Sequence, residues 1–286
     1  MITEEVKRNL ISFIKNHLVE RESYEILLMQ HLKMSALYWA LCSLRLLGEE
    51  IDGSMALDFV KTCRNADGGY GGDLGLDSHL FYTLSALQIL KLVGNELSDV
   101  EIEATTLYVQ SLEKEGVWMG DEWGEEDTRF SYCGILCLDL LGRLEQGISQ
   151  RTLLHIKNCR NWDGGYAAMP GAESHGGQIF CCLAARKLAG DDFKEKLDQE
   201  SLLCWLAMRQ QSEDGGLNGR PMKHTDVCYS WWILASLSIL GHTEVISKEA
   251  LIKFILNSID PDTGGIADRP GDIGDLFHTF FGIAGK

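Results

Sequence analysis

The sequence of 286 residues is 45% hydrophobic and 24% charged, which is typical of a globular protein with one large domain or two small ones. Its formal net charge of −16 argues against nucleic acid as a partner, and no apolar run approaches the ~20 residues of a membrane span. The first residues do not resemble a secretory signal, and the nine scattered cysteines contain no C-x-x-C pair, so we expect a cytoplasmic protein with free thiols.

The first clear helix is an apolar stretch from 35 to 47 that is closed by Gly48. After it, glycine pairs recur about every fifty residues in one sequence context. The pairs lie at 67–70, 163–166, 214–217 and 262–266, and a degraded copy lies at 116–120. Self-similarity at a fixed period of this length indicates a repeat architecture.

Each glycine turn separates two predicted helices. The helices before the turns carry more charge and lie at 57–63, 153–159, 202–209 and 251–256. The helices after the turns begin behind polar caps near 77–79, 127–129, 173–175, 225–226 and Asp275, and four of them end at glycines 94, 142, 190 and 241. These second helices are apolar nearly all round, which predicts that they are buried inside an outer layer of first helices.

The pattern predicts an all-α fold, an α/α barrel (toroid) of about six helix pairs that forms a single domain over residues 1–286. An open solenoid is the alternative. Closure is favoured because it covers the apolar faces of the inner helices, which an open array would expose. If the repeats are equivalent, every inner helix presents its N-terminus to the same rim. That rim would gather His79, Arg129, His175, Asp226, Cys228 and His278.

Three of these rim residues form a candidate metal site. Asp226, Cys228 and His278 offer oxygen, sulfur and nitrogen, and three protein ligands with one open position are typical of a catalytic zinc site. The alternative is a capping aspartate beside a buried cysteine. Asp275 would orient His278 from behind. Because a helix N-terminus lowers the pKa of a thiol, we expect Cys228 to be held as a thiolate.

A candidate anion site lies next to the metal site in the sequence. Arg220, Lys223 and His175 are the cationic candidates, and Tyr229 could add a hydroxyl donor. The alternative is a solvated basic loop beside a core histidine. Aromatic side chains on the inner helices either pack the core or line a cavity for a long apolar ligand. They are Trp39, Tyr82, Tyr132, Trp231 and Trp232.

Four long motifs resemble those of the β subunits of protein prenyltransferases, most closely the type II (Rab geranylgeranyl) group. They are Gly-Gly-Leu-Asn-Gly-Arg-Pro at 215–221 with its continuation to Trp232, Glu-Ser-His-Gly-Gly-Gln at 173–178, Gly-Gly-Ile-Ala-Asp-Arg-Pro-Gly-Asp at 264–272, and Phe-His-Thr-Phe-Phe-Gly-Ile-Ala-Gly at 277–285. The resemblance runs from about Tyr24 to the last residue.

The resemblance implies a role for each matching residue. It implies zinc ligation by Asp226, Cys228 and His278, with these and Tyr229 as the catalytic set. It implies diphosphate binding by His175, Arg220, Lys223 and Tyr229, peptide contact by Arg129, and a lipid pocket that includes Trp232. Asp268 matches a carboxylate that supports magnesium in farnesyl enzymes, so Mg²⁺ is a possible second metal, although Arg269 could neutralise the same phosphates.

The implied function is a zinc-dependent protein geranylgeranyltransferase type II. Its zinc would lower the pKa of a substrate cysteine thiol, the thiolate would attack C1 of geranylgeranyl diphosphate, and the cationic residues would neutralise the departing diphosphate. The implied partners are an α subunit in an obligate heterodimer and a Rab GTPase that a Rab escort protein presents. The alternatives are a type I or farnesyl enzyme, an inactive prenyl-binding scaffold, and a terpene-cyclase-like barrel, for which the sequence has no D-x-D-D motif.

The floor of the lipid pocket is expected to select the longer lipid. The farnesyl enzymes that this chain resembles place bulky aromatic residues where it has Ser35 and Leu84, whereas Tyr132 is compatible with either lipid. Small residues leave a deeper cavity, which suits a twenty-carbon chain. Two departures from the family pattern are Met169, where a polar or basic residue is expected, and the end of the chain at Lys286, which suggests either a truncated last helix or a barrel that closes differently.

Overall fold

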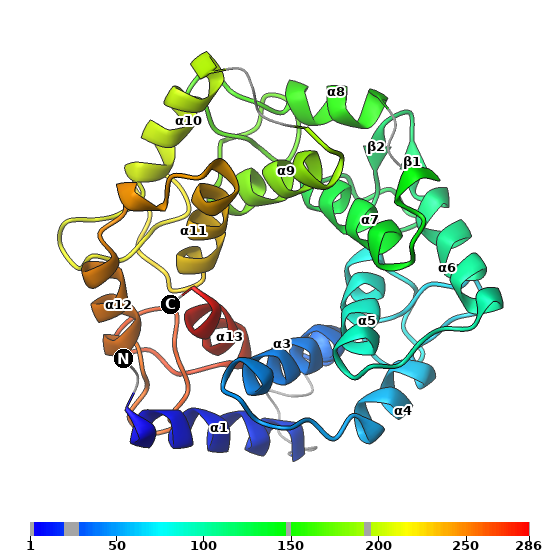
Figure 1. Ribbon diagram of the computed structural model, residues 1–286, viewed down its shortest axis with the longest axis horizontal. Coiled ribbons are helices and arrows are strands. Elements are labelled where there is room, and N and C mark those ends of the chain that lie inside the picture. The colour runs from blue at the N-terminus through cyan, green and yellow to red at the C-terminus, as the bar shows by residue number, and fades with distance from the viewer. Residues whose placement is uncertain (1–2, 20–28, 147–149, 192–195, 286) are drawn as a thin grey trace.

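The computed structural model describes residues 3–19, 29–146, 150–191 and 196–285. Tyr24, where the resemblance was expected to begin, lies outside these residues. Within them, twelve α-helices form two concentric layers around a common axis, as Figure 1 shows. The predicted all-α barrel of six helix pairs is therefore confirmed.

The inner layer contains six helices that pack in sequence order around the ring. They are α3 (Lys33–Leu46), α5 (Leu80–Leu92), α7 (Thr128–Leu140), α9 (Gly176–Leu188), α11 (Tyr229–Leu240) and α13 (Leu276–Ala284). The ring closes where α13 packs against α3. An open solenoid is excluded, because its first and last helices would not touch.

The outer layer supplies one partner for each inner helix. Its helices are α1 (Glu4–Val19), α4 (Ser54–Thr62), α6 (Asp99–Ser111), α8 (Gln150–Asn158), α10 (Lys196–Ala207) and α12 (Lys248–Asn257). The short elements are η1 (Gln30–Leu32), η2 (Leu144–Gln146), η3 (Thr243–Val245) and the hairpin of β1 (Glu113–Lys114) and β2 (Val117–Trp118). None of the helices in the described ranges is both long and apolar enough to cross a membrane.

Helix α1 was not predicted, although it completes the outer ring. Its residues Leu10, Phe13 and Ile14 are buried in the core, and the helix packs against both α3 and α13. The glycine pair at 264–265 shows how α1 substitutes for the outer helix of a following repeat. A Cβ on Gly265 would lie 2.6 Å from the ring of Phe13, just as one on Gly216 would lie 2.8 Å from Phe254 of α12. The second glycine of each of these pairs is therefore required by close packing.

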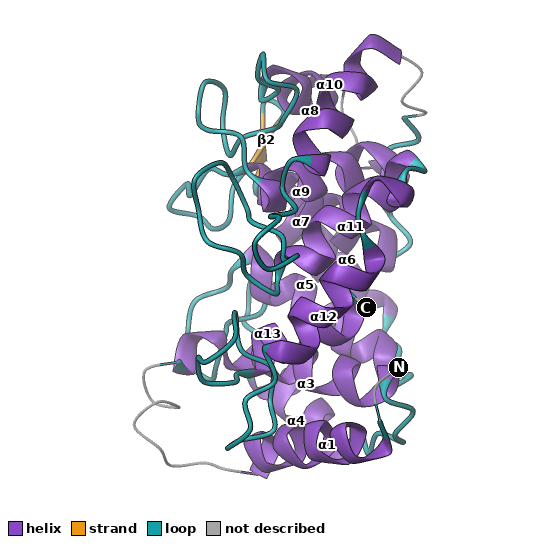
Figure 2. Ribbon diagram, turned by 90° about the vertical axis from the view of Figure 1, so that its left-hand side faces the viewer, coloured by secondary structure: helices purple, strands orange, loops and turns teal. Residues whose placement is uncertain are grey.

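Five long loops connect outer to inner helices, and Figure 2 shows them gathered on one side of the ring. We call these segments, 63–79, 112–127, 159–175, 208–228 and 258–275, the rim loops. Each rim loop accepts a hydrogen bond of 2.7–2.9 Å from the start of the preceding inner helix. The donors and acceptors are Met34 and Gly72, Leu80 and Gly120, Thr128 and Ala168, Gly176 and Gly219, and Val227 and Asp268. This repeated bond keeps the inner-helix N-termini at one rim, as predicted.

Candidate metal and anion site

Four of the six inner helices are capped in the same way at their starts, and this positions the candidate residues. The side chains of His79, Asp127, His175 and Asp226 each accept the backbone N–H two residues further on, at 2.7–3.1 Å. Regular helix α11 begins only at Tyr229, three residues later than predicted. Asp226 nevertheless occupies the equivalent capping position, because its carboxylate accepts the N–H of Cys228. The capping geometry is what aims these side chains at the mouth of the ring.

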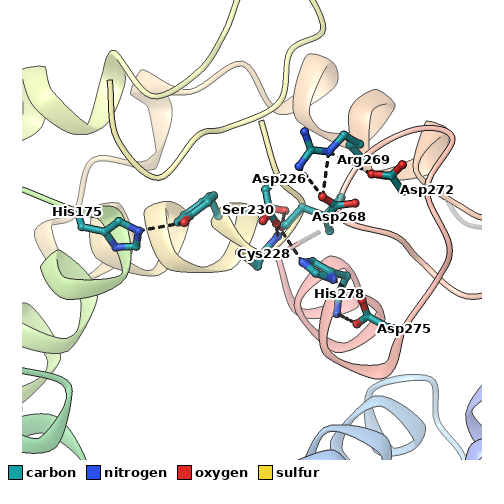
Figure 3. A network of polar contacts seen from close by, with 11 residues as sticks. His175, Asp226, Cys228, Ser230, Asp268, Arg269, Asp272, Asp275 and His278 are labelled. Carbon is teal, nitrogen blue, oxygen red and sulfur yellow. Dashed lines mark hydrogen bonds and ion pairs between the residues drawn. The ribbon is translucent and has the colours of Figure 1, made fainter. Parts of the chain in front are cut away.

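The side chains of Asp226, Cys228 and His278 converge. One ligand atom from each lies within 4.8 Å of the others, and His278 Nε2 lies 3.3 Å from Asp226 Oδ1. Figure 3 shows the three side chains meeting between the start of α11 and the start of α13. The oxygen, sulfur and nitrogen donors are those that zinc prefers, so the residues present fit this metal.

Asp275 supports His278 from the opposite side. Its Oδ2 lies 2.6 Å from His278 Nδ1, and its Oδ1 accepts the backbone N–H of His278 at 2.8 Å (Figure 3). Carboxylates behind ligating histidines select the tautomer and orient the ring. The two carboxylates hold an imidazolium in the protein without metal, because burial lowers the pKa of His278 but its hydrogen bonds with Asp226 and Asp275 raise it to about 9.

The protonation of Cys228 differs from the prediction. Burial, and then the negative charge of Asp226, raise the pKa of the Cys228 thiol well above its usual range. The helix N-terminus is therefore too weak to hold a thiolate, and that expectation is wrong for the protein alone. Burial also opposes ionisation of Asp226, but hydrogen bonds from His278 and Cys228 lower its pKa. A cation at this place would favour the ionised forms of both groups.

His175 and Tyr229 form the second part of the site. Nδ1 of His175 accepts the N–H of Gly177 at 3.1 Å, so in the neutral ring the proton is on Nε2, which lies 3.0 Å from the Tyr229 hydroxyl. The ring is neutral because burial, and then the positive charge of Arg220, lower the pKa of His175. Nε2–H therefore donates to Tyr229, and the tyrosine O–H is left to donate to another group.

Gly219 allows this tyrosine to lie against the rim loop. A Cβ at position 219 would lie 2.2 Å from the ring of Tyr229. Asn218 anchors the same loop, because its buried amide donates to the carbonyl of Lys223 at 3.0 Å and its Oδ1 accepts from Arg209 at 3.2 Å. The backbone that carries Arg220 and Lys223 is thus held in place before any ligand arrives.

The two predicted cations of the loop, Arg220 and Lys223, differ in whether they form an ion pair. Arg220 forms an ion pair of 2.5 Å with Glu173, a residue whose contact the sequence did not indicate. The side chain of Lys223 is exposed, and no partner for it is found in the described parts of the chain. Between them Met222 is fully exposed with a left-handed φ of 64°, a conformation that usually requires glycine. The structure does not bring Lys223 into contact with His175 or Tyr229.

Arg129 lies at the start of α7 and is already paired. Its guanidinium lies 3.0 Å from Asp127 and 3.7 Å from Glu125. Glu125 also accepts from His79 Nε2 at 3.2 Å. His79, Asp121 and Glu125 form a second group with metal-ligand atoms, but Nδ1 of His79 accepts the N–H of Phe81. Nε2 therefore carries the proton, which makes it a hydrogen-bond donor and not a ligand.

The predicted lipid-pocket residues fall into two classes. Ser35 and Leu84 are buried, and Ser35 Oγ lies 3.2 Å from Ser85 Oγ across α3 and α5. Tyr132 and Trp232 are partly exposed and both pack against Phe180, with ring centroids 5.3 Å apart. Trp232 also packs against Phe281 at 4.6 Å. Aromatic side chains from α7, α9, α11 and α13 thus meet inside the ring.

The sequence of the chain is similar to those of known proteins. The chain matches the family described as "Prenyltransferase alpha-alpha toroid domain" over residues 6–285. It is 36% identical to a Saccharomyces cerevisiae protein named "Geranylgeranyl transferase type-2 subunit beta", over 98% of this chain and 88% of the relative. It is 45% identical to "Geranylgeranyl transferase type-2 subunit beta 1" of Arabidopsis thaliana, over 93% of this chain and 83% of the relative.

A solved structure shares the fold. The structure titled "Candida albicans protein geranylgeranyltransferase-I complexed with GGPP" superposes with a TM-score of 0.86 and 18% sequence identity. The superposition covers 98% of this chain and 90% of that one.

Proposed function

Because the chain belongs to the prenyltransferase α–α toroid family, among the protein prenyltransferase β subunits, we propose that it is the catalytic subunit of a zinc-dependent geranylgeranyltransferase. In this proposal the enzyme transfers geranylgeranyl from its diphosphate to C-terminal cysteines of Rab GTPases. The observation that carries the proposal is the convergence of Asp226, Cys228 and His278 at a rim that also carries His175, Tyr229 and Arg220.

Asp226, Cys228 and His278 would hold the zinc. Bound zinc would lower the pKa of a substrate thiol, so that a thiolate is present near neutral pH. Asp275 would keep the His278 ring in the orientation that presents Nε2 to the metal. The protein must release the proton that Asp226 and Asp275 stabilise on His278 before the site can be loaded.

The leaving diphosphate would be bound by preorganised donors. The Tyr229 hydroxyl is free to donate because it already accepts from His175, and its pKa is raised by burial and by the nearby Cys228 and Asp226, so it stays protonated. Arg220 would exchange Glu173 for the diphosphate, and Lys223, which has no side-chain partner among the described residues, would add a second charge. Donors aimed at developing negative charge lower the barrier most when they need no reorganisation.

Magnesium is not needed in this proposal. The candidate ligand Asp268 accepts from Arg269 at 2.6 Å, and Arg269 also lies 3.3 Å from Asp272. The carboxylate of Asp268 is therefore already neutralised by a guanidinium. Transfer should proceed at full rate when Mg²⁺ is omitted, and a strict requirement for added Mg²⁺ would show that Asp268 is a metal ligand instead.

The rim loops carry exposed apolar side chains. Each of the five rim loops carries a large apolar side chain that is at least 70% exposed, namely Leu74, Trp123, Trp162, Met222 and Ile273. Exposed apolar residues gathered on one face are typical of a protein interface. We propose that this face binds a prenyltransferase α subunit, and that a Rab escort protein presents the Rab substrate to the completed site.

The test is transfer of labelled geranylgeranyl to a Rab substrate, with and without the α subunit and an escort protein. The proposal expects transfer only with the complete set. Efficient transfer to a peptide that ends in a single prenylatable cysteine, without an escort protein, would favour the type I alternative. Binding of the lipid diphosphate without any transfer would favour an inactive prenyl-binding scaffold.

A further inference from the structure

Two stacked polar contacts connect α3 and α5 inside the ring. The first is the contact between Ser35 and Ser85, and the second is a hydrogen bond of 3.1 Å from Gln88 Nε2 to the Tyr38 hydroxyl. Tyr38 and Gln88 each follow the serine of their own helix by three residues. Because a helix rises ~1.5 Å per residue, the second contact lies ~4.5 Å further from the rim.

Tyr38 faces the interior of the ring. It contacts Gln88 of α5 on one side and the ring of Phe280 of α13 on the other, with a centroid distance of 5.7 Å. Since α5 and α13 are the two inner neighbours of α3 (Figure 1), a side chain that touches both points toward the axis.

Tyr38 and Gln88 are partly exposed, as are Ala36 and Leu37 of α3, whereas the residues on either side of these positions are buried. Ser35, Trp39 and Ala40 of α3 are buried, as are Leu87 and Ile89 of α5. No partner of the Gln88 amide other than Tyr38 is found among the described residues. Its second N–H and its carbonyl therefore face the space inside the ring, where water can reach them. Nearer the rim, the hydroxyls of Ser35 and Ser85 contact each other, and the aromatic rings of α7, α9, α11 and α13 pack together inside the ring.

We infer that Tyr38 and Gln88 form a polar floor that limits the length of the isoprenoid chain the ring can hold. This inference rests on the proposed function. An isoprenoid tail that stops above the pair passes no polar side chain of α3 or α5 that lacks a partner, because the Ser35 and Ser85 hydroxyls already contact each other. A longer tail would cover the Gln88 amide and remove the water from its carbonyl and its second N–H, and a buried polar group without a partner is costly. The floor would thus select against chains longer than geranylgeranyl, while Ser35 and Leu84 leave room for that chain.

The test measures binding, so that it does not depend on transfer. The protein in complex with its α subunit is titrated with non-transferable phosphonate analogues of the C15, C20 and C25 diphosphates. The variants are Gln88→Leu, which removes the amide at similar size, Tyr38→Phe, which removes only the hydroxyl, and the double variant. Tyr108→Phe is the matched control, because it removes a buried tyrosine hydroxyl from the outer helix α6.

The wild-type complex should bind the C20 analogue more tightly than the C25 analogue. Gln88→Leu should narrow the preference for C20 over C25 by about threefold to tenfold, as expected for one polar group, and leave C20 binding almost unchanged. Tyr38→Phe leaves the Gln88 amide without its partner and should not narrow the preference. The double variant removes both polar groups and should narrow the preference at least as much as Gln88→Leu. Melting temperatures confirm that the variants are folded.

Three outcomes would overturn the inference. One is an unchanged C20 to C25 ratio in all three variants, another is an equal shift in Tyr108→Phe, and the third is a wild-type complex that binds none of the analogues. The third result would also remove the proposed function. If the analogues bind with the expected ratios but labelled lipid is never transferred, the proposed function fails and the polar floor stands.

Discussion

Asp275 and His278 are joined twice, through the backbone N–H and through Nδ1 of the histidine, by the two oxygens of one carboxylate at 2.8 and 2.6 Å. The same carboxylate caps helix α13 and orients the candidate metal ligand. Helix start and metal site are therefore built by one residue.

Replacing this carboxylate should weaken metal binding without removing a ligand. Asp275→Asn should lower zinc affinity by about 10-fold to 100-fold, which is typical for the loss of a carboxylate behind a ligating histidine. The measurement is competition with a chelator of known affinity. Asp272→Asn is the control, since Asp272 is exposed, pairs with Arg269 and makes no contact with His278. Equal affinities in wild type and Asp275→Asn would contradict this role.

Removing the charge of Glu173 should strengthen diphosphate binding. Arg220 is paired with Glu173 in the protein alone, so ligand binding must break that ion pair. Because the pair is largely exposed, we expect Glu173→Gln to lower the Kd for geranylgeranyl diphosphate by only about twofold to fivefold. Glu249→Gln on α12 makes the same charge change elsewhere and should have no effect. Weaker binding in Glu173→Gln would show that Glu173 helps to hold the ligand.

A large residue at position 35 should change the lipid preference. Ser35 is buried where α3 meets α5, so the indole of Ser35→Trp would take up space at this level of the pocket. We expect the ratio of kcat/KM values to shift toward farnesyl diphosphate. Leu84→Tyr narrows the pocket from α5 and should act in the same direction. If both variants fold and the preference is unchanged in each, pocket depth does not set the choice of lipid.

The stability of the metal-free protein should fall between pH 6.5 and 9 because of His278. Its folded-state pKa of about 9 lies above its ordinary value of 6.5. The stabilisation is therefore complete below pH 6.5 and is lost as the pH rises through 9. The upper limit of the effect is on the order of 3 kcal/mol. The free energy of unfolding in urea is measured for wild type and His278→Gln at pH 6 and pH 9.5, with chelator present. The difference between the two proteins gives the contribution of His278 at each pH. Parallel pH dependence in the two proteins would contradict the assignment.

The repeats made the fold predictable, since glycine pairs and apolar helices mark each unit. Helix α1 was missed because it has no glycine turn of its own and its exposed face is polar, so only its packing against Gly265 identifies it as an outer helix. The equivalence of the inner-helix starts also predicted that Asp226 and His278 lie close together, although His278 follows Asp226 by 52 residues in the sequence.

Contacts between side chains of different repeats could not be predicted. The pairs of Arg220 with Glu173 and of His79 with Glu125 depend on rotamers at the rim, and nothing in the spacing of these residues indicates them. The protonation of Cys228 was predicted wrongly for a related reason. Its position at a helix start was visible in the sequence, but the burial and the adjacent Asp226 charge that outweigh the helix were not.

The most direct test of the central claim combines metal content with transfer in the complex of this chain, an α subunit, an escort protein and a Rab substrate. We predict one zinc per complex and labelled geranylgeranyl on the Rab C-terminal cysteines. Cys228→Ala should lose both, whereas Cys204→Ala, which removes an exposed thiol, should keep both. Full transfer by Cys228→Ala, or a zinc-loaded wild-type complex that transfers nothing, would contradict the account.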